Sequence, residues 1–156
     1  GRDREALAKF APESEVPGES LAVPTWFYGH EPSNLFSTHI AKYFANSIRE
    51  DGLLAISLGG VVFAPGSAGT LQEVFMDLAQ NHYATFTLRS PMVFLGRERF
   101  ASVHRLICDF IEEKGKREEY GDLVALFDDP MDVTDFILAN PPRERVAHPP
   151  LYELVK

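Results

Sequence analysis

From residue 61 onward, short apolar runs alternate with amphipathic helical patterns, and this alternation constrains the fold more than any other feature. The apolar runs at residues 61–63, 92–95 and 123–127 are short and continuous, as buried strands are. Between them, apolar residues recur at helical spacing over 71–83 and 100–111. Strands and helices in this order form βαβ units. The sequence therefore predicts an α/β fold, with a Rossmann-like, doubly wound parallel sheet in three layers.

Other elements are predicted from local signals. A short apolar run predicts a strand over 20–24. Asp129 followed by Pro130 predicts the capped start of another helix. Apolar residues at helical spacing also predict a helix that ends near Asp51-Gly52, and the residues on its apolar face are Phe36, Ile40, Tyr43, Phe44 and Ile48.

These elements predict one domain over residues 1–156, with a connector at 1–19, a core at 20–139 and an extended tail at 140–156. At most four strands are visible, whereas doubly wound sheets usually have five or more. The sequence also begins with Gly1 rather than methionine. We therefore expect a native protein that is longer at its N-terminus, and a chain here that lacks the N-terminal strands of the sheet.

A loop of small residues between the run at 61–63 and the following helix is the strongest functional signal. Ligands of open parallel sheets bind at the carboxyl ends of the strands. Glycines in such a loop let a phosphate approach the backbone, and the first amides of the helix then point at that phosphate. The sequence predicts a phosphate site formed by Pro65, Gly66, Ser67, Ala68, Gly69 and Thr70.

Glu73 has two interpretations. Thr70 and Glu73 match a capping box, in which the Thr70 hydroxyl binds the third amide of the helix and Glu73 reaches back to the Thr70 amide. Alternatively, the Glu73 carboxylate lies beside the ligand and acts as a base or stabilises a cation. The two roles are compatible, and both stay open at this point.

The segment 65–73 resembles the P-G-G-x-G-T-x-x-E motif of the LOG ("Lonely Guy") proteins, with Ser67 where the family usually has glycine. The resemblance covers most of 20–138. LOG proteins are Rossmann-fold phosphoribohydrolases that cleave nucleoside 5′-monophosphates into base and ribose 5-phosphate without a metal or redox cofactor. The resemblance implies that Gly66, Ser67, Gly69 and Thr70 hold the phosphate and that Glu73 is the catalytic carboxylate. It also implies a homodimer.

The chain departs from the family pattern at the preceding helix. The family has a catalytic arginine there, and His39 stands nearest that position. A histidine could pass a proton to the leaving base, which makes His39 a second catalytic candidate. A single histidine near a helix start also has an ordinary structural interpretation. The glycine-rich loop that the family carries upstream is absent from this chain.

Composition excludes several classes of partner. The net charge of −8 disfavours nucleic acid, because a nucleic-acid binder needs a positive surface. No apolar run approaches the ~20 residues of a membrane span. The single cysteine suits a reducing compartment, so we expect a cytoplasmic protein. No zinc motif is present, and we expect neither a metal nor a cofactor.

Three hypotheses follow from the sequence. The first is an enzyme that hydrolyses a nucleoside monophosphate, with Glu73 and His39 as catalytic candidates. The second is a module that senses a nucleotide, or a related phosphorylated small molecule, without turning it over. The third is a dimerisation fragment whose sheet edge is covered by a second copy.

Overall fold

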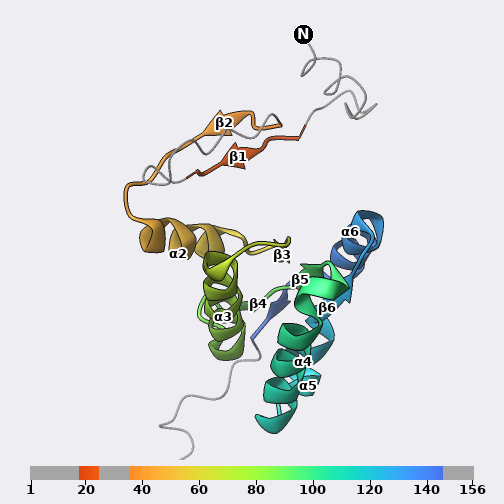
Figure 1. Ribbon diagram of the computed structural model, residues 1–156. Helices are drawn as coiled ribbons and strands as arrows, with labels where there is room; N and C mark the ends of the chain where they lie inside the picture. Colours follow the sequence, from red (N-terminus) through yellow and green to blue (C-terminus); the bar gives the residue numbers. More distant parts are fainter. Residues whose placement is uncertain (1–17, 25–35, 146–156) are drawn as a thin grey trace, which may run out of the picture. The chain divides into compact units, whose positions relative to one another are not determined.

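The computed structural model describes residues 18–24 and 36–145 (Figure 1). These residues fall into two compact units, which meet in the sequence between Leu53 and Leu54. The first unit contains two short strands and the beginning of helix α2 (Asn46–Ile56). The second contains a parallel sheet and the helices packed against it, so it holds most of the predicted α/β core.

In the first unit, β1 (Leu21–Ala22) pairs in parallel with β2 (His39–Ile40). The amides of Thr38 and His39 both donate to the Ser20 carbonyl at 2.9 Å, and the Ala41 amide donates to the Ala22 carbonyl at 2.9 Å. The strand predicted over 20–24 is thus confirmed at its centre.

The helix predicted from Phe36 to Ile48 is wrong over most of its length. Residues around β2 are extended, because their amides bind carbonyls that lie some 18 positions away in sequence rather than one helical turn away. Helix α2 begins only at Asn46 and continues through Asp51 and Gly52 to Ile56, so the predicted end is also wrong. Phe36 and Phe44 are 57% and 64% exposed, so their helical spacing does not mark a buried face.

The second unit is built on a parallel sheet of β3 (Val61–Phe63), β5 (Met92–Leu95) and β6 (Val124–Phe127), in the order β3-β5-β6. Helix α3 (Ala68–Tyr83) connects β3 to the rest of the unit, α4 (Arg97–Glu113) connects β5 to β6, and α6 (Pro130–Ala139) follows β6. The three predicted strands and the helices between and after them are confirmed. The unit is therefore a mixed α/β fold with a parallel sheet.

Helices lie on both faces of this sheet. Phe94 stacks on Phe63 of the neighbouring strand and contacts Phe100 of α4, with ring centroids 5.2 and 5.3 Å apart respectively. The same face carries the buried cluster that includes Val74 of α3. On the opposite face, Phe127 contacts Phe136 of α6 at 5.6 Å. Alternate residues of the strands thus contact helices on opposite faces of the sheet.

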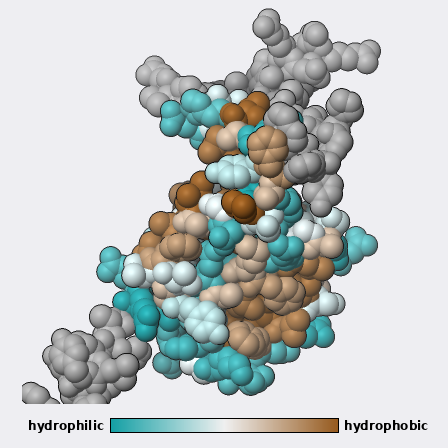
Figure 2. Space-filling view, turned by 90° about the vertical axis from the view of Figure 1, so that its left-hand side faces the viewer, coloured by the Kyte–Doolittle hydropathy of each residue, from teal (hydrophilic) through white to brown (hydrophobic). Residues whose placement is uncertain are grey.

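The strand β3 lies at the edge of the three-stranded sheet. Phe63 is buried, but Val62 is 45% exposed, so the prediction that 61–63 is buried on both faces is wrong. Large exposed apolar side chains also occur on helices, among them Phe75 of α3 and Leu138 of α6. Figure 2 shows such hydrophobic surface beside hydrophilic surface on the face in view. Dimerisation through any of it stays a prediction.

Shorter elements close the amino end of the sheet. The short helix α5 (Arg117–Tyr120) and the 3₁₀ turn η1 (Gly121–Leu123) lead into β6. The strand β4 (Leu88–Arg89) precedes β5 and pairs antiparallel with β7 (Arg143–Glu144). The tail predicted to be extended forms the strand β7 at Arg143–Glu144, and its residues 146–156 lie outside the described part. None of the helices described here has the length and apolarity to cross a membrane.

Candidate functional site

The loop predicted to bind phosphate lies at the carboxyl end of the parallel sheet. Phe63 ends β3 and Ala68 begins α3, so Pro65, Gly66 and Ser67 form the connection between strand and helix. The side chains of residues 64–68 are exposed, whereas Gly69 and Thr70 are half-buried in the first turn of the helix. The predicted strand–loop–helix order is present, with the helix starting within the small-residue segment.

The first turn of α3 leaves its amides unbound. Ser67 is the N-cap residue, and its side chain makes no capping hydrogen bond. The first amide to bind a carbonyl of the turn is that of Leu71, which donates to the Ser67 carbonyl at 3.4 Å. In the part of the chain that the structure describes, the amides of residues 68–70 therefore have no acceptor. They make the end of α3 a positive pole.

The capping box expected from Thr70 and Glu73 is not formed, because the helix begins before Thr70. Thr70 occupies the third position of α3 instead of the N-cap. Its hydroxyl packs over Gly66, where an added Cβ would lie only 2.0 Å from Thr70 Oγ1. A side chain at position 66 would therefore force Thr70 or the loop to move, whether or not a phosphate approaches.

Arg99 is the residue of this site that the sequence patterns did not indicate. It lies in the first turn of α4, and its guanidinium donates to the Gly66 carbonyl from Nη2 at 3.2 Å and from Nε at 3.4 Å. The side chain is exposed, and it forms no ion pair with any described residue. Neighbouring Arg97 differs, since it is held by Asp128 with an Nε–Oδ2 distance of 3.3 Å. Arg99 thus brings an unneutralised cation to the loop.

The two catalytic candidates lie in different units. Glu73 is half-buried on α3, one turn beyond Thr70. His39 lies in β2 of the first unit, where its exposed ring is 3.8 Å from Glu19 Oε1. The structure therefore describes Glu73 beside the loop and His39 within a separate unit, and it defines no shared geometry for the pair.

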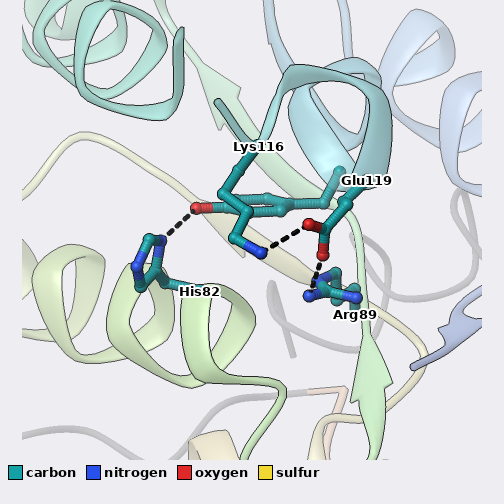
Figure 3. Close-up of polar contacts among 5 residues, drawn as sticks. His82, Arg89, Lys116 and Glu119 are labelled. Atoms are coloured by element: carbon teal, nitrogen blue, oxygen red, sulfur yellow. Dashed lines mark hydrogen bonds and ion pairs between the residues drawn. The ribbon is translucent and has the colours of Figure 1, made fainter. Parts of the chain in front are cut away.

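A second cluster of polar residues lies at the amino end of the sheet, opposite the loop predicted to bind phosphate. Arg89 and Lys116 both pair with the carboxylate of Glu119, and His82 Nδ1 lies 3.1 Å from the hydroxyl of Tyr120 (Figure 3). These residues are brought together from three segments of the chain, namely the end of α3, β4 and residues 116–120, so no sequence motif indicated them.

A buried carboxyl group lies between these two ends on α3. Asp77 is 2% exposed, and burial raises the pKa of its carboxyl to about 7. Its Oδ1 accepts from Asn81 Nδ2 at 3.3 Å, while Oδ2 has no partner in the described structure. Asn81 in turn accepts from the Ser90 amide at 2.7 Å, which connects α3 to the start of β5. The network belongs to the core rather than to the loop.

Among residues 18–24 and 36–145, no three His, Cys, Asp or Glu side chains are placed to hold a metal ion. No protein-family profile matches the chain, and no curated protein matches it significantly.

Proposed function

We propose that the carboxyl end of the β3-β5-β6 sheet binds the phosphate of a nucleoside 5′-monophosphate, in a cytoplasmic Rossmann-like domain. One observation carries the proposal. The guanidinium of Arg99, which pairs with no carboxylate among residues 18–24 and 36–145, donates to the Gly66 carbonyl beside the N-terminus of α3, whose first amides have no acceptor in the same residues. A guanidinium and a helix N-terminus are the two features that most often bind phosphate in proteins, and here they come from different elements of one sheet edge.

The chemistry of this edge suits a phosphate group better than a neutral ligand. Arg99 uses only part of its guanidinium on Gly66, which leaves donors for a phosphate oxygen. Each charge-assisted hydrogen bond contributes about 1.5–3 kcal/mol. The net acidity of the chain does not oppose this, because the attraction is local to the backbone amides and to one arginine.

We further propose that the ligand is hydrolysed at its N-glycosidic bond, with Glu73 as the carboxylate. Glycosidic cleavage passes through an oxocarbenium-like state, which a nearby carboxylate stabilises while it aligns water. Glu73 suits this role because it follows the phosphate loop by one helical turn and is half-buried. The motif that it shares with the LOG proteins supports the same assignment.

A sensor that binds the nucleotide without hydrolysis is the second candidate. The observation in its favour is that His39, which stands where the family has its catalytic arginine, is exposed and lies close to Glu19. In this alternative the phosphate loop and Arg99 keep their role, and Glu73 only shapes the pocket.

Release of free base from a panel of nucleoside 5′-monophosphates tests the enzymatic proposal. The wild type should release base from at least one monophosphate and from none of the matching nucleosides. Glu73→Gln should retain nucleotide binding and lower base release by at least a hundredfold. Glu113→Gln, which removes an exposed carboxylate at the far end of α4, is the matched control and should behave as the wild type. Tight binding without release by the wild type would leave only the sensor.

A further inference from the structure

A cavity of about 650 Å³ opens at the amino end of the sheet, away from the phosphate loop. Its walls come from the end of α3, the paired strands β4 and β7, and α5. The lining residues are His82, Tyr83, Arg89, Lys116, Glu118, Glu119, Arg143, Glu144 and Arg145. The volume lies in the range of ~300–1,000 Å³ that small-molecule sites occupy. The lining thus combines four basic and three acidic side chains with His82 and Tyr83.

The central feature of the cavity is a carboxylate shared by two cations. Glu119 pairs with Arg89 through Oε2 and with Lys116 through Oε1 at 2.5 Å (Figure 3). Arg89 is only 6% exposed, and its guanidinium lies 5.7 Å from the centre of the Tyr120 ring. Because one carboxylate neutralises only one of the two cations, the cluster retains a positive charge next to the cavity.

His82 and Tyr120 lie next to this cluster. Burial and the nearby charges of Lys116 and Arg89 lower the pKa of His82 below its ordinary value, although Glu119 opposes this. Burial raises the pKa of Tyr120 to about 12, so its hydroxyl stays protonated. His82 and Tyr120 therefore present neutral hydrogen-bonding groups beside the two cations.

The remaining charges of the lining lie nearer to solvent. Arg143 is neutralised by Asp122, to which its Nη1 and Nη2 donate at 2.8 and 2.7 Å. Arg145 is exposed and forms no ion pair with a described residue. Glu118 and Glu144 are also exposed, so water screens their charges more strongly than the charge of the buried Arg89. The least screened positive charge of the lining is therefore that of Arg89, at the buried end of the cavity.

We propose that this cavity is a binding site for a small oxyanion, a carboxylate or a phosphate, that replaces the Glu119 carboxylate on Arg89 and Lys116. Glu119 can be displaced because it is on the four-residue helix α5 and its side chain is 37% exposed. The displaced carboxylate would turn to solvent while the bound anion satisfies both cations. This site is separate from the proposed nucleotide site, since none of residues 65–70 and 73 lines the cavity.

Amide chemical shifts of the whole chain during titration with succinate or inorganic phosphate test the proposal. Saturable shifts should appear at residues 87–89, 116–120 and 143–145. Glu119→Gln removes the competing carboxylate, so it should bind the anion about tenfold more tightly than the wild type and regain thermal stability when the anion is added. Lys116→Met should weaken binding about tenfold. Glu118→Gln is the matched control on the same short helix, and it should leave the affinity within about twofold of the wild type.

The two anions distinguish the two chemical sources, because a carboxylate site prefers succinate and a phosphate site prefers phosphate. Arg99→Ala keeps this test independent of the proposed nucleotide site: it should abolish any phosphate shift at residues 66–70 and leave those at 116–120 unchanged. The proposal is overturned if neither anion gives saturable shifts at 116–120, or if Glu119→Gln binds more weakly than the wild type. It is equally overturned if Glu119→Gln loses stability that neither anion restores, because Glu119 would then be only a structural bridge.

Discussion

The two ends of the β3-β5-β6 sheet differ in which groups their cationic side chains bind. At the carboxyl end, Arg99 is exposed and, within the part of the chain that the structure describes, donates to a carbonyl without pairing with a carboxylate; the first amides of α3 have no acceptor there. At the amino end, Arg89 is buried and shares Glu119 with Lys116. The carboxyl end thus offers unused hydrogen-bond donors to a ligand, whereas the amino end offers donors that an internal carboxylate already occupies.

A site whose donors are open to a ligand and a site whose donors already bind an internal carboxylate should therefore respond differently to mutation. Removing a group from the carboxyl end should affect binding more than stability, because little of the fold depends on it. Removing a group from the amino end should change stability first, because Arg89 is buried and the polar groups around it are bound to one another. The predictions below use this contrast, from the largest expected effect to the smallest.

The largest effect on stability is expected at Asp77, whose carboxyl is buried on α3 between the two ends of the sheet. Its pKa in the folded protein, about 7, lies above the ordinary value of 3.8, so the folded state holds its proton where the unfolded state has lost it. The contribution of this group to stability is thus complete below about pH 4 and is lost as the pH rises through 7. Between pH 5 and pH 8, Asp77→Asn should gain roughly 2 to 3 kcal/mol relative to the wild type.

Urea unfolding of both proteins at the two pH values measures this gain. Asp109→Asn, which alters an exposed carboxylate of α4, provides the control and should show no comparable change with pH. If the difference between Asp77→Asn and the wild type is the same at pH 5 and pH 8, Asp77 does not titrate as its burial indicates.

Much of the second unit could be predicted from the sequence, because its signals are local. The apolar runs around Phe63 and Phe94 mark strands, and the stripe that includes Val74 marks the core face of α3. The pairing of Asp129 with the Met131 amide at 2.8 Å confirms the predicted helix start. Each of these signals depends on residues within a few positions of one another.

The failures involve longer distances or competing local signals. Ile40 has the spacing of a helical face, but pairing with β1 makes it part of a strand. Thr70 matches a capping box, but α3 begins at Ala68 and the hydroxyl packs over Gly66 instead. Arg99 reaches Gly66 across 33 positions, a contact that no local pattern encodes.

At the carboxyl end, Gly66→Ala should disturb the loop more than the global fold. The new methyl group would meet Thr70 Oγ1 at 2.0 Å and Thr70 Cβ at 3.1 Å, so Thr70 or the loop must move. We expect a loss of about 1–2 kcal/mol in unfolding free energy. The double variant Gly66→Ala/Thr70→Ala should recover part of this loss, since it removes the nearer of the two atoms. Additive effects in this double-mutant cycle would mean that Thr70 is not the source of the strain.

A smaller effect is expected at Asp129, which caps α6 at the same end of the sheet. Its Oδ1 accepts from the Met131 amide, and alanine would leave that amide to water. Asp129→Ala should lower the unfolding free energy by about 1 kcal/mol, while Asp129→Asn should keep most of the stability because asparagine also caps. Equal losses in the two variants would show that charge, rather than the cap, is what matters at this position.

Calorimetric titration of the wild type and Arg99→Ala with nucleoside 5′-monophosphates and the matching nucleosides tests the central claim most directly. If Arg99 and the amides of α3 hold the phosphate, the wild type will bind at least one monophosphate at least tenfold more tightly than its nucleoside. Arg99→Ala will lose about tenfold in affinity for the monophosphate, with unchanged affinity for the nucleoside and unchanged stability. Equal affinity of the wild type for both compounds, or a monophosphate affinity that Arg99→Ala leaves unchanged, would contradict the account.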